Sequence, residues 1–150
     1  MTPGRDVRSL CLAASLAAAA LAPGCLPPPP QPARPNVLTD PCAERLHNLC
    51  GNLLLYYSAH RKLPPALEDL ISAGSFSRSP AVCPVSNRPY VYDPAGLPLP
   101  KRRGRLVLYD PLPSHAKMRW GILVGPPAPG GLITANVVLV SEEELTAARE

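Results

Sequence analysis

Prolines between Pro23 and Pro41 limit the fold of this chain more than any other feature. The stretch LPPPPQPARPN, residues 26–36, cannot form the interior of a helix, because each proline removes a backbone donor and clashes with the preceding turn. An extended polyproline II segment of about 3 Å per residue is expected instead. Folding is therefore expected only from residue 40 onward, and residues 40–150 have room for one domain.

The segment before these prolines has the layout of an export signal. Arg5 and Arg8 make its start cationic. Residues 9–22 then form an uncharged, mostly apolar run of about 14 residues, shorter than the roughly 20 that a membrane-spanning helix needs. A cationic start, a short apolar middle and small residues at the end are typical of a secretory signal.

Gly24 followed by Cys25 resembles the end of a bacterial lipoprotein signal, in which the cysteine becomes lipidated. We therefore expect removal of residues 1–24 and lipidation of Cys25. Residues 25–39 would then form a linker that holds the domain away from the membrane. Ordinary secretion after cleavage at Ala22, and an anchor that stays uncleaved, are the alternatives.

A helix is expected to begin with Pro41, because Asp40 is a favoured N-cap and proline suits the first helical position. Its apolar stripe recurs at helical spacing. The members of the stripe are Leu46, Leu49, Cys50, Leu53, Tyr56, Tyr57 and His60. The pattern ends at Leu63-Pro64-Pro65, and a short second helix is expected over Pro65–Ala73 with Gly74 as its terminator.

After residue 90 the pattern changes to short β-branched runs, separated by the turn-forming stretches DPAG, DPLPS and GPPAPGG. The expected strands are Tyr90–Tyr92, Arg105–Asp110, Met118–Val124 and Leu132–Val140. Ser141, with Glu144 three positions later, forms a capping box that opens a last short helix. The predicted fold class is therefore α+β, with a long and a short helix packed on a small antiparallel β-meander.

The folded part also resembles bacterial pseudopilin-like proteins, relatives of the major pseudopilin of type II secretion. The residues that carry the resemblance are Cys42-x3-Leu46-x2-Leu49-x3-Leu53-x2-Tyr56, His60-x2-Leu63-Pro64-Pro65, Leu67-Glu68-Asp69-Leu70, Cys83-Pro84, Pro89-Tyr90-Val91-Tyr92-Asp93-Pro94 and Ser141-Glu142-Glu143-Glu144-Leu145. The resemblance implies a long helix, a Pro-Pro turn, a small sheet and a place beside a secretion apparatus. Two features depart from the family: the proline stretch replaces the hydrophobic polymerising helix, and Thr134-Ala135-Asn136-Val137 replaces an Asp-Gly-His box.

Cys42, Cys50 and Cys83 remain in the domain after cleavage at Cys25. Cys42 and Cys50 lie about 12 Å apart along a straight helix, too far to bridge each other. A disulfide between this helix and Cys83 suits an exported protein. The family resemblance favours Cys42–Cys83 as the pair, and three reduced cysteines are the alternative.

No catalytic residue, metal site or cofactor is predicted. A CxxC pair is absent and the histidines do not cluster in the sequence, which argues against zinc. A divergent hydrolase is the alternative, in which His60 or His115 would act with Asp110 or Cys83. Calcium binding by the acidic run 142–144 is the other alternative, although the capping box already accounts for that run.

The basic run Lys101, Arg102, Arg103 and Arg105 is a candidate contact for an anionic surface or for DNA. A solvated loop beside a sheet edge explains it equally simply. Because the net charge is only +4 and no aromatic residues interleave the run, no nucleic-acid partner is expected.

These observations together predict a non-enzymatic lipoprotein of the cell envelope, facing the periplasm or the exterior. The lipid at Cys25 would be its membrane contact. The domain would act as a structural or interaction module for a protein partner, without a small-molecule substrate.

Overall fold

The computed structural model describes residues 36, 39–72 and 81–150. The expected signal sequence, the lipidation site Cys25, most of the linker and the expected helix terminator Gly74 lie outside the described residues. Among the helices that are described, none is long and apolar enough to cross a membrane.

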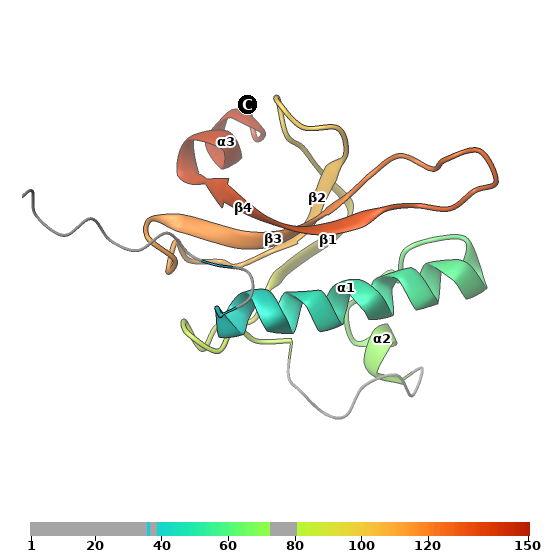
Figure 1. Cartoon of the computed structure of the whole chain (residues 1–150), viewed down its shortest axis with the longest axis horizontal. Coiled ribbons are helices and arrows are strands. Elements are labelled where there is room, and N and C mark those ends of the chain that lie inside the picture. Colours follow the sequence, from blue (N-terminus) through green and yellow to red (C-terminus); the bar gives the residue numbers. More distant parts are fainter. Residues whose placement is uncertain (1–35, 37–38, 73–80) are drawn as a thin grey trace, which may run out of the picture. The chain divides into compact units, whose positions relative to one another are not determined.

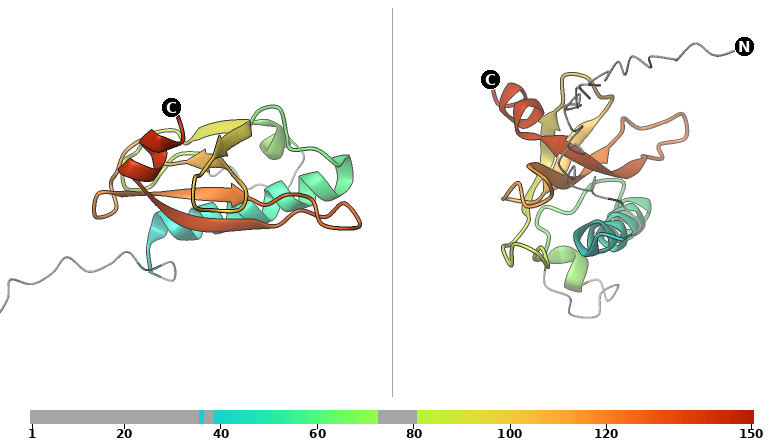
Figure 2. Two further views of the ribbon diagram at one scale, coloured as in Figure 1. Left: turned by 90° about the horizontal axis from the view of Figure 1, so that it is seen from above. Right: turned by 60° about the vertical axis from the view of Figure 1, so that its left-hand side comes forward.

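The described elements form a four-stranded sheet with helices on both of its faces. In chain order they are α1 (Pro41–His60), α2 (Asp69–Ser72), β1 (Val91–Pro98), β2 (Arg105–Tyr109), β3 (Met118–Val124), β4 (Ala135–Ser141) and α3 (Glu142–Ala147). The strands pair antiparallel in the order β1-β2-β3-β4, so each strand neighbours the next along the chain. Helix α1 lies along one face and α3 lies on the other (Figure 1, Figure 2). The predicted α+β class with an antiparallel meander is confirmed.

Two separate apolar cores hold these layers together. Trp120 and Ile122 of β3 belong to the core that α1 covers, together with the buried stripe of the helix. Leu123 and Val140 belong to the second core, which Leu145 of α3 covers. The alternation along β3 follows from the two-residue period of a strand, which sends successive side chains to opposite faces.

Helix α1 begins and ends with defined caps. Its N-cap is Asp40, whose Oδ1 accepts hydrogen bonds from the backbone N–H groups of Cys42 and Ala43, at 2.9 and 3.4 Å. Pro41 occupies the first helical position, where its missing N–H costs nothing. At the other end Arg61 adopts a left-handed conformation with φ 56°, and its N–H bonds to the carbonyl of Tyr57. The N-cap therefore stands where the sequence predicted it.

The expected second helix over Pro65–Ala73 is wrong in extent, because α2 covers only Asp69–Ser72. The preceding residues form tight turns instead. Asp69 and Leu70 donate to the carbonyls of Ala66 and Leu67, three residues earlier, at 3.3 and 3.2 Å. A carbonyl used in such a three-residue turn is not available for the four-residue spacing of an α-helix.

Strand β1 is longer than the expected Tyr90–Tyr92, since it continues to Pro98 through the stretch predicted as a turn. Pro94 is tolerated there because β1 is an edge strand. The register with β2 shifts between Tyr92 and Leu97. Gly96 lies in this irregular part with φ 65°, a conformation that favours glycine.

Strand β4 begins at Ala135, three residues later than the expected start at Leu132. Thr134 still belongs to the loop, and its carbonyl accepts from the N–H of Gly125 at 2.8 Å. This bond closes the loop directly beyond the last ladder pair, Val124 with Ala135. The apolar pattern of residues 132–134 therefore reflects a closed loop and not a strand.

Gly121 and Gly51 form a matched pair for a test of the packing. A Cβ on Gly121 would lie 2.7 Å from the carbonyl oxygen of Leu108 and 2.7 Å from Leu106 Cδ1, whereas a Cβ on Gly51 meets nothing within 4 Å. We expect Gly121→Ala to lower the free energy of unfolding by about 1–3 kcal/mol, because overpacking forces the strands apart. Gly51→Ala should raise it by about 0.5–1 kcal/mol, because alanine favours a helix interior. Urea unfolding measures both, and equal stability of the two variants would contradict this packing.

Candidate functional site at the start of helix α1

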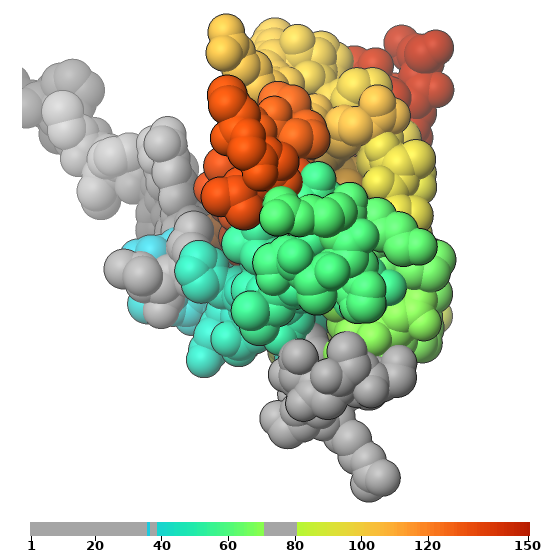
Figure 3. Space-filling model, turned by 90° about the vertical axis from the view of Figure 1, so that its right-hand side faces the viewer, coloured from blue at the N-terminus to red at the C-terminus, as the bar shows by residue number. Residues whose placement is uncertain are grey.

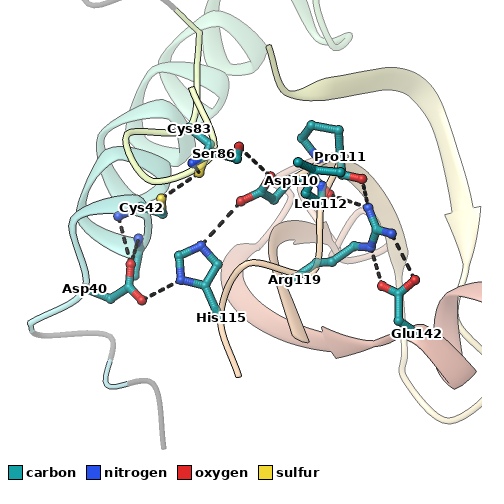
Figure 4. Close-up of polar contacts among 11 residues, drawn as sticks. Asp40, Cys42, Cys83, Ser86, Asp110, Pro111, Leu112, His115, Arg119 and Glu142 are labelled. Atoms are coloured by element: carbon teal, nitrogen blue, oxygen red, sulfur yellow. Dashed lines mark hydrogen bonds and ion pairs between the residues drawn. The ribbon is translucent and has the colours of Figure 1, made fainter. Parts of the chain in front are cut away.

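Reactive side chains from four segments meet beside the first turn of α1. We call Asp40, Cys42, Cys83, Asp110 and His115 the N-cap cluster (Figure 4). The thiols of Cys42 and Cys83, the Asp110 carboxylate and the imidazole of His115 all place a polar atom within 4.8 Å of one another. All four residues are buried, and Cys42, Cys83 and Asp110 are 0% exposed. Among the described residues, this is the group of side chains whose ligand atoms lie close enough together to hold a metal ion.

The two sulfurs of the cluster face each other. Cys42 Sγ lies 2.8 Å from Cys83 Sγ, although the residues are 41 positions apart in the chain. Both are free cysteines in this structure. The loop that carries Cys83 is fixed by a turn from the Asn87 N–H to the Cys83 carbonyl and by Arg45 of α1, which donates to the carbonyl of Val82 at 2.9 Å. Local turn structure and a helix contact thus bring the sulfurs together.

Burial keeps the thiols of Cys42 and Cys50 protonated at neutral pH. Burial, followed by the neighbouring Cys83, raises the pKa of Cys42 to about 12. Burial also raises the pKa of Cys50, which lies two turns further along α1. Since the thiolate is the nucleophilic form of cysteine, neither Cys42 nor Cys50 is activated for attack on a substrate.

The imidazole of His115 lies between two carboxylates. Its Nδ1 is 2.8 Å from Asp40 Oδ2, and its Nε2 is 3.3 Å from Asp110 Oδ2. A tight turn places it there, because Ala116 and Lys117 have φ values of 52° and 65° and the His115 N–H bonds back to the carbonyl of Met118. His115 therefore connects the cap of α1 to the end of β2.

Asp110 is held by bonds to only one of its oxygens. Asp110 Oδ1 accepts from the hydroxyl of Ser86 and from the N–H of Leu112, both at 3.2 Å. Among the residues that the structure describes, neither Asp110 Oδ2 nor His115 Nε2 has a hydrogen-bond partner of good geometry, although both atoms are buried. Two buried polar atoms that face each other without a hydrogen bond are unusual in a folded protein.

Asp40 serves the helix and the histidine at the same time. Although burial alone would raise the pKa of Asp40, the indole of Trp120, the backbone N–H of Cys42 and the imidazole of His115 lower it overall. The charged carboxylate is therefore the form that the folded protein stabilises. A negative charge at this position also suits the positive end of the helix dipole.

The other candidate residues from the sequence do not join the cluster. His60 is the last residue of α1, and its ring lies 4.2 Å from that of Tyr56, centroid to centroid. With about 1.5 Å of rise per residue, a helix of this length puts His60 roughly 30 Å from the cluster. The structure thus brings together Cys83, Asp110 and His115 of the hydrolase alternative and separates His60 from them.

The basic run is partly occupied by contacts within the domain. Arg102 pairs with Glu144 at 3.0 Å and also donates to the carbonyl of Leu139 at 2.7 Å. Arg105 donates to the carbonyl oxygens of Ala95 and Gly96. Lys101 and Arg103 are exposed. Half of the run therefore has structural contacts, Arg102 with β4 and α3 and Arg105 with β1.

The acidic run 142–144 has structural partners as well. Ser141 and Glu144 form the expected capping box, with the Glu144 N–H donating to Ser141 Oγ at 3.1 Å. Glu142 pairs with Arg119. The hydrogen bond from Arg119 lowers the pKa of Glu142 in spite of a small opposing effect of burial. These carboxylates point to different arginines and do not converge on a cation site.

An apolar cavity of about 650 Å³ lies at the opposite end of α1. Tyr57 and Leu63 line it from the helix side, and Pro127 and Ile133 line it from the β3–β4 loop. Figure 3 shows this loop in orange above the green C-terminal end of α1. No residue of the N-cap cluster lines this cavity or the smaller one beside Leu67 and Tyr90. Neither cavity leads a substrate to the cluster.

Comparison with known proteins gives no relative. No protein-family model, no curated protein and no solved structure matches this chain. The interpretation of the site therefore depends on its own geometry.

The sequence pointed to all five cluster residues but assigned them to separate features. Asp40 is expected as a helix cap and Cys42 and Cys83 as a disulfide pair, with Cys83 also a candidate in the hydrolase alternative. Asp110 and His115 were considered only for catalysis. Ser86, which orients Asp110, was not considered at all. One signal was available in the sequence, since Asp110 and His115 flank the short turn between two expected strands, and a hairpin brings such positions close together.

Asp40→Asn tests the double role of Asp40, because asparagine keeps a capping side chain and removes the charge. The folded protein lowers the pKa of Asp40, so the carboxylate stabilises the fold above the unfolded pKa of about 3.9, and this contribution is lost as the pH falls through the folded value. At neutral pH the variant should lose about 1–2 kcal/mol of unfolding free energy. Urea unfolding should show this deficit shrinking below about pH 4.

Asp93→Asn is the matched control, because Asp93 is exposed and only caps a local turn at Ala95. Its effect on stability should be small at every pH. A deficit of Asp40→Asn that stays constant down to about pH 3 would contradict the role of the charge.

Proposed function

We propose that this chain is a non-enzymatic lipoprotein of the cell envelope, whose folded domain is a structural or interaction module. The observation that carries the proposal is the apposition of Cys42 and Cys83, with 2.8 Å between their buried sulfurs. This separation is shorter than an ordinary contact between two thiols. It suits two cysteines that form a disulfide in an oxidising compartment, which is where exported proteins fold.

A disulfide at this position has a clear physical benefit. It closes a chain segment of 41 residues, which in the loop-entropy account stabilises the fold by about 4 kcal/mol. The bond forms when two thiols lose two protons and two electrons to a disulfide oxidant of the exporting compartment. The start of α1 would then be covalently joined to the loop before β1. Such a lock suits a small domain that must stay folded outside the cell.

The absence of an enzymatic role is supported by burial. Cys42 and Cys83 are fully buried, and His115 is 5% exposed with both ring nitrogens directed at carboxylates. A general base must reach the proton that it removes from a substrate. An imidazole enclosed in this way is better suited to structure than to catalysis.

The anchor and the partner are supported by the sequence. The apolar run that ends at Gly24-Cys25 supports lipidation, and the prolines of the linker support a spacer between membrane and domain. We also propose that the domain is pseudopilin-like. That proposal is supported by the residue pattern from Cys42 to Leu70 and by the capped last helix, and it favours a protein partner beside a secretion apparatus.

Metabolic labelling with a palmitate analogue tests the anchor in a bacterium that processes lipoproteins. The wild-type chain should incorporate label and remain with the membrane fraction. Cys25→Ser should abolish the label, because the thiol that carries the lipid is lost. Cys11→Ser is the matched control, since Cys11 lies in the expected signal and should not affect labelling. Label that persists unchanged in Cys25→Ser would refute lipidation at this position.

A further inference from the structure

Besides the pair of sulfurs that suits a disulfide, the N-cap cluster contains a set of potential metal ligands. Four potential ligand atoms, two sulfurs, one carboxylate oxygen and one imidazole nitrogen, lie within 4.8 Å of one another. The residues that supply them, Cys42, Cys83, Asp110 and His115, are all buried. Sulfur and nitrogen ligands with one carboxylate form a donor set that suits zinc.

The hydrogen bonds around His115 leave one pair of atoms in conflict. Asp40 Oδ1 accepts from the N–H of Cys42, and when Asp40 Oδ2 accepts in the same way, the hydrogen of its 2.8 Å contact lies on His115 Nδ1. In a neutral imidazole Nε2 then has a lone pair, and it faces the carboxylate of Asp110 at 3.3 Å. Two acceptors in this position repel each other. A proton on Nε2, or a cation between the two atoms, removes the conflict.

The spacing of these atoms is close to that of a tetrahedral zinc site. With zinc bonds of about 2.0–2.1 Å to nitrogen and oxygen, the two ligand atoms lie about 3.3–3.4 Å apart. The observed distance from Nε2 to Asp110 Oδ2 is 3.3 Å. Two sulfurs bound to one zinc lie about 3.8 Å apart, so Cys42 and Cys83 must separate by about 1 Å from their 2.8 Å contact. The other spacings among the four ligand atoms are all below 4.8 Å.

The residues around these atoms already hold the ligands in place. Asp40 fixes His115 through Nδ1, the arrangement in which a carboxylate orients a zinc-binding histidine. Ser86 and the N–H of Leu112 hold the other oxygen of Asp110 and leave Oδ2 free. Both supporting contacts orient the ligand atoms toward the cluster.

We propose that the reduced protein binds one zinc ion through Cys42 Sγ, Cys83 Sγ, Asp110 Oδ2 and His115 Nε2. Binding releases the two thiol protons, and the charges of two thiolates and one carboxylate then exceed that of the ion by one. The start of α1, which carries Cys42, offsets part of that excess. A disulfide between the same sulfurs excludes the ion, because neither sulfur can then act as a thiolate.

The redox balance of this exchange is simple. A dithiol such as dithiothreitol reduces the Cys42–Cys83 disulfide and becomes a cyclic disulfide itself. The two electrons and two protons that it supplies give two thiols in the protein. Zinc then displaces the two protons. The same four side chains would thus hold either a covalent lock or a metal lock between α1 and the loops around the sheet.

Titration with cobalt(II) tests the proposal, because cobalt reports its ligands by colour. The full chain is reduced with dithiothreitol, the reductant is removed without oxygen, and cobalt chloride is added. We expect one cobalt per chain, with a thiolate-to-cobalt charge-transfer band and the intense visible bands of a tetrahedral ion. Zinc chloride should then bleach the spectrum. An oxidised sample of the same chain should show no such bands.

Variants assign the ligands. Cys42→Ser and Cys83→Ser should remove the charge-transfer band or halve it, and Asp110→Asn and His115→Gln should lower cobalt affinity at least about tenfold. Asp40→Asn should lower affinity by about 10-fold to 100-fold, because it orients His115 without binding the ion. Cys50→Ser is the matched control, since Cys50 is buried in the same helix outside the cluster, and it should bind cobalt as the wild type does.

A second readout covers variants that fold poorly. Zinc should raise the thermal unfolding midpoint of the reduced wild type and of reduced Cys50→Ser, and leave that of the oxidised wild type unchanged. A reduced wild type without the cobalt spectrum and without a zinc-dependent midpoint would overturn the proposal. Cobalt bands that stay the same in Asp110→Asn and His115→Gln would also overturn it.

Discussion

The contact between Asp40 and His115 connects the two halves of this domain. Asp40 accepts the free N–H groups at the start of α1 with one oxygen and holds His115 with the other. His115 lies 75 positions later in the chain, in the turn before β3. A single carboxylate therefore joins the start of α1 to the turn before β3. The sulfurs of Cys42 and Cys83 meet because this contact and the Cys83 loop hold both sides of the cluster.

The cluster also explains why a domain with few aromatic residues can hold its layers in register. Leu46, Leu53 and Trp120 are among the buried residues of the core between α1 and the sheet, and apolar contacts have no preferred direction. Buried polar groups do have one, because each must find a partner. A disulfide between Cys42 and Cys83 would add a covalent limit at the same point.

Local features of the sequence predicted local structure well. Asp40-Pro41 and Ser141 with Glu144 are capping signals that act within four residues, and both caps stand at the expected positions. The prediction of a turn at DPAG is wrong, because this stretch lies in an edge strand, which tolerates a proline. Whether a strand lies at an edge depends on the whole sheet and cannot be read from a short stretch of sequence. The second helix is shorter than predicted, because the hydrogen bonds to the carbonyls of Ala66 and Leu67 have the three-residue spacing of tight turns.

The candidate site could not be predicted as a unit for a similar reason. Its members come from the helix cap, the loop before β1, the end of β2 and the β2–β3 turn. Zinc sites with short CxxC spacing can be recognised in a sequence. Ligands that come from four separate segments and meet only in the folded protein cannot. In the sequence, only the spacing of cysteines and histidines speaks against zinc, and that spacing does not show which side chains meet in the fold. Only the arrangement of α1 on the sheet reveals that the four side chains meet.

The most direct test of this account is the state of the cysteines in the protein isolated from the cell envelope. The chain is denatured without reductant, its free thiols are alkylated, and mass spectrometry locates the label. The account predicts label on Cys50 alone, with the peptides of Cys42 and Cys83 joined until a reductant separates them. Label on all three cysteines before reduction, with or without bound metal, would show that the start of α1 is not covalently locked and would contradict the account.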